Sequence, residues 1–394
     1  MHSLIKQKIL RILKAQTFFI FGGHMIKILY VISDKNIGGA GVLLCNLLAH
    51  LDRRRFCPAV ALPYGSSLRE RLLRYNVQIC ELENPADRAN LASIRELISV
   101  IRSVSPDVVH ANAAICARIA GQICGKKTVH TRHCYFPIQR EGGLAGLARN
   151  FGNRKLSDLA IATSESAAEN LRDLGIPRKK IRVILNGSDP VREVSEGELW
   201  DLRARLGLSE EDFCVGICAR LEPYKGHTTF LRAVERLEQM ELPRRMKFLI
   251  VGEGSQRRHI EQNIRVLGLS DCVRMVGFVE DMAPVYRLLR VHVNASSGTE
   301  TSCLAISEGM SASLPTVATD YGGNRVMIGK GGAGILVPVN DPIAMAEAIE
   351  KIASDEVLEN SMRAAAYTRY LDRFTAERMT RETEQVYVEL MEKK

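Results

Sequence analysis

A chain of 394 residues is too long for one ordinary hydrophobic core and is about right for two α/β domains. With 46% hydrophobic and 25% charged residues, its composition is that of a folded protein, which argues against disordered and low-complexity classes. The formal charge of +9 is uneven, because residues 1–190 contain 28 Lys and Arg against 14 Asp and Glu. This excess is compatible with ordinary solubility or with an anionic partner, such as a membrane surface or a phosphate-bearing acceptor. Nucleic acid is disfavoured, because no aromatic residues are interleaved with the basic ones.

Residues 1–24 precede the first strand-like run, which begins at Met25. Between residues 4 and 14 the apolar side chains gather on one helical face and most of the basic ones on the other. One interpretation is a short interfacial helix that lies on anionic lipid. The other is that Met25 is the true start and the segment is not translated. A secretory signal is disfavoured, because charge interrupts the apolar stretch and no small-residue cleavage site follows.

From Met25 onward, apolar runs rich in β-branched residues alternate with amphipathic stretches, a pattern typical of βαβ units in a parallel sheet. The runs of the first half lie at residues 28–32, 59–63, 77–82, 107–112, 127–133, 159–164 and 181–187. A second series lies at residues 213–219, 246–252, 273–278, 290–296, 315–320 and 334–339. We therefore expect two tandem Rossmann-like, doubly wound domains. Ligands of such sheets bind beyond the carboxyl ends of the strands, so the site is expected in a cleft between two facing domains.

The predicted segments are an N-terminal extension (1–24), a first domain (25–190), a linker and helix (191–211), a second domain (212–372) and a C-terminal helix (373–394) that packs back towards the first domain. No run approaches the ~20 apolar residues that span a bilayer. The ten cysteines form no CxxC pair, and most lie in apolar runs. They are interpreted as small buried residues in a reducing cytosol, not as disulfides or zinc ligands.

Two basic residues open the second domain's candidate site. Arg220 and Lys225 lie just past the first strand-like run of that domain and before a helix expected near His227. A diphosphate group needs cations at such a place: arginine offers a bidentate fork and lysine a point charge. Either residue alone is compatible with a solvated surface charge, so their shared position in a strand-to-helix loop is what points to phosphate.

Two glutamates, Glu300 and Glu308, lie in the segment SSGTETSCLAISEGM. Thr299 or Thr301 is expected to cap the helix that follows, with Glu300 at its start and Glu308 about two turns inside. The N-terminus of that helix would offer N–H groups and a positive dipole to phosphate. A carboxylate is a good acceptor for vicinal hydroxyls of a sugar or a ribose.

Taken in order, the motifs resemble those of the retaining GT-B glycosyltransferases of family 4. They are the Arg220–Leu221 and Lys225–Gly226 loop, IVGEG at 250–254, MVGFVED at 275–281, the E-x7-E pair Glu300 and Glu308, LPTVATDYGGN at 314–324 and GILVPVNDP at 334–342. The resemblance extends over essentially residues 25–390 and is densest in the C-terminal half. It implies that Arg220 and Lys225 hold the donor diphosphate, that Glu300 contacts the donor sugar and that Glu308 contacts the ribose. Further donor contacts are predicted at Thr301, Ser302 and Cys303.

In the N-terminal half, Gly38, Gly39 and Gly41 follow the first strand as GGxG, not as the GxGxxG of dinucleotide-binding proteins. These glycines permit a tight turn, and without side chains they also let backbone N–H groups approach an anion. The resemblance places Gly38 and Gly39 against the donor phosphates and sugar. It also implies that His133, at the end of a strand, contacts the donor sugar, ahead of His110 and His130.

The sequence departs from the family pattern in places. Ser302 and Cys303 stand where the family usually has Phe-Gly, Gly309 follows Glu308 in place of Ala, and Arg325 and Val326 occupy a region where a Glu is common. These departures bear on the identity of the donor sugar. Asn186–Gly187–Ser188 is interpreted as turn chemistry near the hinge between the domains.

The sequence thus predicts a cytoplasmic, retaining, hexosyltransferase-type glycosyltransferase, peripheral at the inner face of the plasma membrane. A nucleotide-sugar donor and a glycan or lipid-linked glycan acceptor of envelope or polysaccharide synthesis are expected. No metal and no other cofactor are expected, because no Asp-x-Asp stands in a suitable loop and no His/Cys cluster is present. The alternatives are an inactive sugar-nucleotide-binding partner of another transferase, or a sugar-nucleotide epimerase or phosphorylase with the same fold. The missing GxGxxG disfavours an NAD-dependent oxidoreductase.

Overall fold

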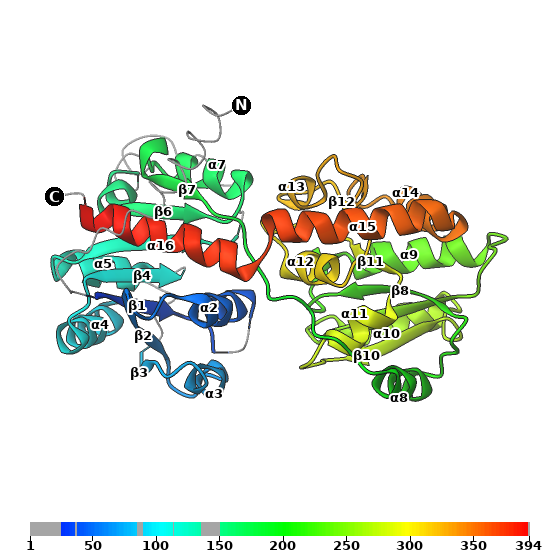
Figure 1. Cartoon of the computed structure of the whole chain (residues 1–394), viewed down its shortest axis with the longest axis horizontal. Coiled ribbons are helices and arrows are strands. Elements are labelled where there is room, and N and C mark those ends of the chain that lie inside the picture. Colours follow the sequence, from blue (N-terminus) through cyan, green and yellow to red (C-terminus); the bar gives the residue numbers. More distant parts are fainter. Residues whose placement is uncertain (1–24, 36–37, 85–89, 113, 135–149, 393–394) are drawn as a thin grey trace, which may run out of the picture.

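The computed structural model describes residues 25–35, 38–84, 90–112, 114–134 and 150–392. It contains two parallel β-sheets, each flanked by helices, that lie side by side (Figure 1). The two-domain Rossmann-like arrangement predicted from the sequence is confirmed. The two interpretations of the extension concern residues 1–24, which lie outside the described part of the chain.

The N-terminal sheet has the strand order β3-β2-β1-β4-β5-β6-β7. Its strands are β1 (Ile26–Ile32), β2 (Phe56–Pro63), β3 (Gln78–Leu82), β4 (Val108–Asn112), β5 (Lys127–Arg132), β6 (Leu159–Ala162) and β7 (Ile181–Val183). The helices are α2 (Gly39–His50), α3 (Leu68–Leu73), α4 (Leu91–Val104), α5 (Ile115–Ile123) and α7 (Glu165–Asp173), with a short 3-10 turn η1 (Arg178–Lys180). Strand β1 is buried on both faces: Tyr30 contributes to the core under α2, and Leu29 to the core under α4 and α5. Cover on both faces explains why its sequence is a continuous apolar run.

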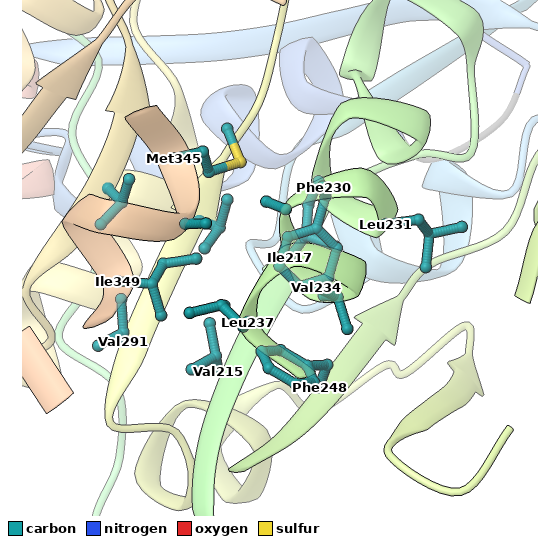
Figure 2. Packing of buried hydrophobic residues seen from close by; sticks show 14 of the residues in the cluster. Val215, Ile217, Phe230, Leu231, Val234, Leu237, Phe248, Val291, Met345 and Ile349 are labelled. Carbon is teal, nitrogen blue, oxygen red and sulfur yellow. The ribbon is translucent and has the colours of Figure 1, made fainter. Parts of the chain in front are cut away.

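The C-terminal sheet has the order β10-β9-β8-β11-β12-β13. Its strands are β8 (Phe213–Cys218), β9 (Met246–Val251), β10 (Val273–Gly277), β11 (Val291–Asn294), β12 (Thr316–Thr319) and β13 (Gly334–Val337). The helices are α8 (Glu196–Leu206), η2 (Pro223–Lys225), α9 (His227–Glu238), α10 (Arg257–Val266), α11 (Ala283–Leu288), α12 (Leu304–Ser311), α13 (Asn324–Ile328), α14 (Pro342–Ser354) and α15 (Glu356–Arg373). Figure 2 shows Leu237 of α9 and Ile349 of α14 close to Val215 of β8. Burial of these apolar faces makes the sheet a rigid base for the loops at its edge.

The last helix, α16 (Ala376–Glu392), leaves the C-terminal domain and lies along the N-terminal one (Figure 1). Its Tyr387 hydroxyl lies 2.7 Å from Nδ1 of His110 and 3.1 Å from the hydroxyl of Tyr30. The tyrosine ring is fully buried in the same core as α2. The C-terminal helix is therefore an integral part of the N-terminal domain.

The chain crosses between the domains twice, and the two crossings are joined by hydrogen bonds. The N–H of Ser188 donates to the Phe374 carbonyl at 2.9 Å, and the N–H of Ala376 donates to the Ser188 carbonyl at 3.0 Å. A side chain at Gly187 would lie 2.3 Å from the Thr375 carbonyl oxygen, so this approach requires glycine. The segment interpreted as hinge chemistry thus lies where the two connections meet. Among the described residues, no helix combines the length and apolarity needed to cross a bilayer.

Replacing Tyr387 by alanine is expected to lower the free energy of unfolding by about 3–5 kcal/mol, because a fully buried ring leaves a cavity and two hydroxyl contacts are lost. The matched control is Tyr367→Ala, at a ring that is 41% exposed, with a loss of under ~1 kcal/mol. Urea unfolding measures both values. Equal losses for the two variants would show that α16 does not stabilise the N-terminal core.

Candidate functional site

A tight loop presents Lys225 at the carboxyl edge of the C-terminal sheet. Strand β8 ends at Cys218, and the turn η2 begins with Pro223, whose fixed φ suits the first position of a helical turn. Gly226 then has a φ of +73° and approaches β11 so closely that a Cβ would lie 2.0 Å from the Ala295 carbonyl oxygen. Only glycine meets both demands, so the Lys-Gly pair is explained by the backbone path.

Lys225 and Glu300 form a direct ion pair. The Lys225 ammonium contacts Oε1 of Glu300, and the Ser296 hydroxyl donates to the same oxygen at 3.2 Å. The two side chains are 16% and 5% exposed. Burial by itself lowers the pKa of Lys225, but the adjacent Glu300 carboxylate outweighs burial, and the pKa is raised above its ordinary value. The site therefore keeps a charged ammonium near neutral pH.

Arg220 extends into solvent from the same loop, where it donates to the Tyr224 hydroxyl at 2.7 Å. Its charge acts on Asp34, which follows β1 in the other domain. Burial raises the pKa of the Asp34 carboxyl, and Arg220 partly offsets the rise. Arg220 thus faces the glycine turn that follows β1. A Cβ on Gly38 would lie 3.3 Å from Oδ2 of Asp34, whereas one on Gly39 would meet no atom within 4 Å.

Glu308 lies further along the edge, on α12. The fully buried Tyr286 donates to its Oε2 at 2.8 Å. Desolvation raises the pKa of Glu308 to about 7, and the bond from Tyr286 acts in the opposite direction. A carboxyl group with such a pKa changes its charge across the physiological range.

The cap predicted for α12 is wrong. The helix begins at Leu304, its N-cap is Cys303, and no side chain caps it. Thr299 has a φ of +58°. The Thr301 hydroxyl donates a hydrogen bond to the His133 carbonyl at 2.7 Å. Because this hydroxyl has a partner in the other domain, the chain stays irregular up to Cys303. Glu300 consequently precedes the helix, and Glu308 is its fifth residue, about one turn inside.

His133 approaches this segment from the N-terminal domain. Its Nε2 lies 3.0 Å from Oδ1 of Asn112, and its buried Nδ1 has no hydrogen-bond partner in the described part of the chain. Burial, assisted by the charge of Arg132, lowers the pKa of His133 to about 4, so the ring is neutral at pH 7. His110 and His130 bond within the N-terminal domain: both ring nitrogens of His110 have partners, in Tyr387 and Thr131, and Nδ1 of His130 contacts Ser157. Of the three, only His133 is placed beside the loop of Glu300.

The comparisons with known proteins identify the family of the chain. Residues 37–192 match the family described as Glycosyltransferase Family 4, and residues 212–355 match Glycosyl transferases group 1. The two matches together extend over about three quarters of the chain. The chain belongs to the family 4 glycosyltransferases. It is an enzyme of the glycosyltransferase class with the GT-B fold.

Relatives of this chain are also named as glycosyltransferases. EpsD of Bacillus subtilis, a predicted glycosyltransferase, is 28% identical over 68% of this chain and 73% of its own. The UDP-Gal:alpha-D-GlcNAc-diphosphoundecaprenol alpha-1,3-galactosyltransferase of Escherichia coli is 24% identical over 77% and 80%. Among solved structures, HepE of Anabaena with UDP and glucose superimposes with a TM-score of 0.78 at 22% identity, covering 93% of this chain and 100% of that one. At 22% identity, this superposition is evidence that the two proteins share a fold, and of nothing further.

Sequence reasoning missed residues that build the site without touching a ligand. Gly323 follows β12, and a Cβ there would lie only 1.3 Å from the Thr301 carbonyl oxygen. Gly322 has a φ of +56° and would clash in the same way with the Glu300 carbonyl. The two glycines of the GGN motif thus support the backbone of Glu300 and Thr301. The signal was present in the motif, but its reason is a contact between loops that only the fold brings together.

A small cavity borders the site in the N-terminal domain of the glycosyltransferase. Its volume is about 40 Å³, and it lies beside His133 between α2, the strand ends and α16. Its walls are mainly apolar, with Leu43, Leu47, Ile161, Ile184 and Met379 among the lining residues. The sequence did not predict it, because α16 forms one wall. Across the described ranges, no group of three or more His, Cys, Asp or Glu residues could hold a metal ion.

Proposed function

We propose that this glycosyltransferase moves a sugar from a nucleoside-diphosphate sugar to a hydroxyl of a glycan or lipid-linked glycan, with retention of anomeric configuration. The observation that carries the proposal is the buried pair of Lys225 and Glu300, set in a loop that is hydrogen-bonded to the His133 peptide of the opposite domain. An ammonium, a carboxylate and a neutral imidazole together suit a diphosphate joined to a hydroxyl-rich ring. The UDP and glucose bound to HepE support the same class of donor.

In this proposal, Arg220 and Lys225 neutralise the diphosphate as it departs, which is the electrostatic part of catalysis. Glu300 and His133 hold the sugar, and Glu308 holds the ribose. The bond from the anomeric carbon to the phosphate oxygen breaks through an oxocarbenium-like state. The acceptor oxygen attacks from the same face, and its proton passes to the departing phosphate oxygen. The two basic side chains take the charge-neutralising part that a divalent ion would otherwise supply, so we propose that no metal is required.

A donor screen tests the proposal. The purified protein is incubated with a panel of nucleotide sugars and candidate glycan acceptors, with EDTA and without added metal, while release of nucleoside diphosphate is followed. Release from one donor is expected, with loss of release in Lys225→Ala and Glu300→Ala, and the anomer of the product reports retention. Binding without release in every combination would favour an inactive partner. A product with inverted configuration would contradict the stereochemical part.

UDP is expected to bind about five- to ten-fold more tightly at pH 8 than at pH 6, because the Glu308 carboxyl loses its proton across this range. The pKa of Glu308 in the folded protein lies above its ordinary value, because burial favours the neutral acid. The charged carboxylate that accepts from the ribose hydroxyls therefore forms only as the pH rises through about 7. Titration calorimetry with UDP measures the dissociation constants.

Glu308→Gln is the control for this titration, because the phosphate of UDP itself ionises with a pKa of about 6. The variant keeps that contribution and loses the carboxylate, so its pH dependence is expected to be shallower. Identical pH profiles of variant and wild type would exclude Glu308 as the titrating group.

We further propose that the acceptor is presented on an anionic membrane surface. The support is the basic excess of residues 1–190 and the lipid-linked acceptor in the name of the Escherichia coli relative. The full chain and a variant that starts at Met25 are compared by flotation with phosphatidylglycerol vesicles and with neutral vesicles. Binding of the full chain to the anionic vesicles alone is expected, weaker without residues 1–24. If neither form floats, the membrane part of the proposal is wrong.

A further inference from the structure

A two-residue segment of the C-terminal domain is hydrogen-bonded to three points of the N-terminal half. The hydroxyl of Thr301 donates to the His133 carbonyl at 2.7 Å and lies 3.0 Å from the hydroxyl of Thr163. The hydroxyl of Ser302 accepts from the backbone N–H of Asn186 at 3.1 Å, and the Ser302 carbonyl accepts from the Asn186 side chain at 2.7 Å. Thr301 and Ser302 are each 5% exposed. We call these two residues the interdomain clasp.

The clasp stands between the two residues that are proposed to hold the donor sugar. Thr301 is the next residue after Glu300 in the chain, and its hydroxyl is bonded to the peptide of His133. We propose that Thr301 is a positioning residue that sets the separation between the Glu300 carboxylate and the His133 imidazole. This inference rests on the proposed function, since it assigns a role to the clasp within that donor site.

The chemistry of Thr301 makes it suited to this task. The His133 carbonyl is an acceptor at a domain boundary, and a buried acceptor that loses its donor is unfavourable. The Thr163 hydroxyl, which also lies 3.1 Å from the Arg132 carbonyl, is placed to donate to Thr301 in turn. A chain of two hydroxyls therefore links the end of β6 to the loop of Glu300. Ser302 ties the same loop to the interdomain connection at Asn186.

The sequence analysis predicted donor contacts at Thr301 and Ser302, but their hydroxyls bond to the N-terminal half instead. Arg220, Lys225 and Glu308 all belong to the C-terminal domain, so their mutual geometry does not depend on the opposite domain. Loss of the Thr301 hydroxyl should therefore leave UDP affinity intact and impair the step that needs both domains. A misplacement of reacting groups by about 1 Å costs on the order of 100-fold in rate, so even a small separation of Glu300 from His133 is measurable.

The test compares Thr301→Val, which removes the hydroxyl at nearly constant volume, with Thr301→Ser, which keeps it. The matched control is Thr368→Val, at an exposed threonine of α15 whose hydroxyl bonds only to its own helix, at the Ala364 carbonyl. For each protein we would measure kcat and KM with the donor found in the screen, the dissociation constant for UDP, and the melting temperature. Should Thr301→Val fail to fold, Thr163→Val removes the second hydroxyl of the chain and tests the same link.

For Thr301→Val, kcat is expected to fall about ten-fold or more, with UDP affinity within about two-fold of wild type. Thr301→Ser should recover most of kcat, and Thr368→Val should match wild type. If the wild type is active and Thr301→Val has the same kcat, the positioning role of Thr301 is wrong, and the proposed function is not affected. Equal loss in the valine and serine variants, or parallel loss of kcat, UDP affinity and melting temperature, also overturns the positioning role. An inactive wild type with every donor overturns the proposed function, and the positioning role falls with it.

Discussion

Replacing Lys225 by alanine is expected to lower kcat by at least ~100-fold, because the variant lacks the buried ammonium that would face the departing diphosphate. Replacing Arg220 should cost less, because its guanidinium is exposed to solvent, which screens its charge. Release of nucleoside diphosphate from the identified donor measures both rates.

Lys225→Ala is also expected to lose about 3–5 kcal/mol of unfolding free energy, since it leaves the Glu300 carboxylate buried without its partner. The double variant Lys225→Ala/Glu300→Gln removes both charges, so it should recover much of the stability and none of the turnover. Lys351→Ala, at an exposed position of α14, is the control for loss of a lysine. If Lys225→Ala kept more than half of wild-type kcat, the proposed role of Lys225 would be untenable.

Gly323→Ala is expected to reduce kcat by ~100-fold or to destabilise the C-terminal domain by more than ~3 kcal/mol. The added methyl would lie 1.3 Å from the carbonyl oxygen of Thr301, a distance that no rotamer change can relieve, because both atoms are fixed to backbone. The loop that carries Glu300 must therefore move, or the start of α13 must. Measurements of turnover and of urea unfolding together show whether the Glu300 loop or the start of α13 moves.

Gly331→Ala provides the matched control, because its added Cβ would meet no atom within 4 Å and its backbone is not in the left-handed region. It should resemble wild type in both measurements. A fully active and stable Gly323→Ala would mean that the approach of the GGN turn to the Glu300 loop is looser than the structure shows.

Local sequence patterns were sufficient for most of the fold. The helix expected near His227 begins at that residue as α9, and the strand expected at 28–32 lies within β1. These predictions depend on the spacing of apolar residues over a few helical turns or a few residues of strand, and this spacing can be read directly from the sequence. The boundaries of the short strands were less accurate, since their ends depend on where a neighbouring strand stops pairing.

The helix after Glu300 shows where local rules failed. A threonine ahead of an apolar stretch is a good N-cap by propensity, and both Thr299 and Thr301 met that description. The Thr301 hydroxyl instead bonds to the His133 carbonyl, which is 168 residues away in the chain. Propensity cannot weigh such a partner, because the partner is brought near only by the docking of two domains.

The sequence by itself determined the two doubly wound domains, the loops that carry Arg220 and Lys225, and the family to which the chain belongs, since all of these follow from periodicity and from motifs read along the chain. Only the tertiary structure decided that Lys225 pairs with Glu300, 75 residues away, and that α16 completes the N-terminal core through Tyr387 and His110, 277 residues apart. The physical reason is that the ion pair, the clasp and the cavity depend on distances between distant segments. Those distances are set by how the buried faces of the sheets and helices pack, which the order of residues does not state.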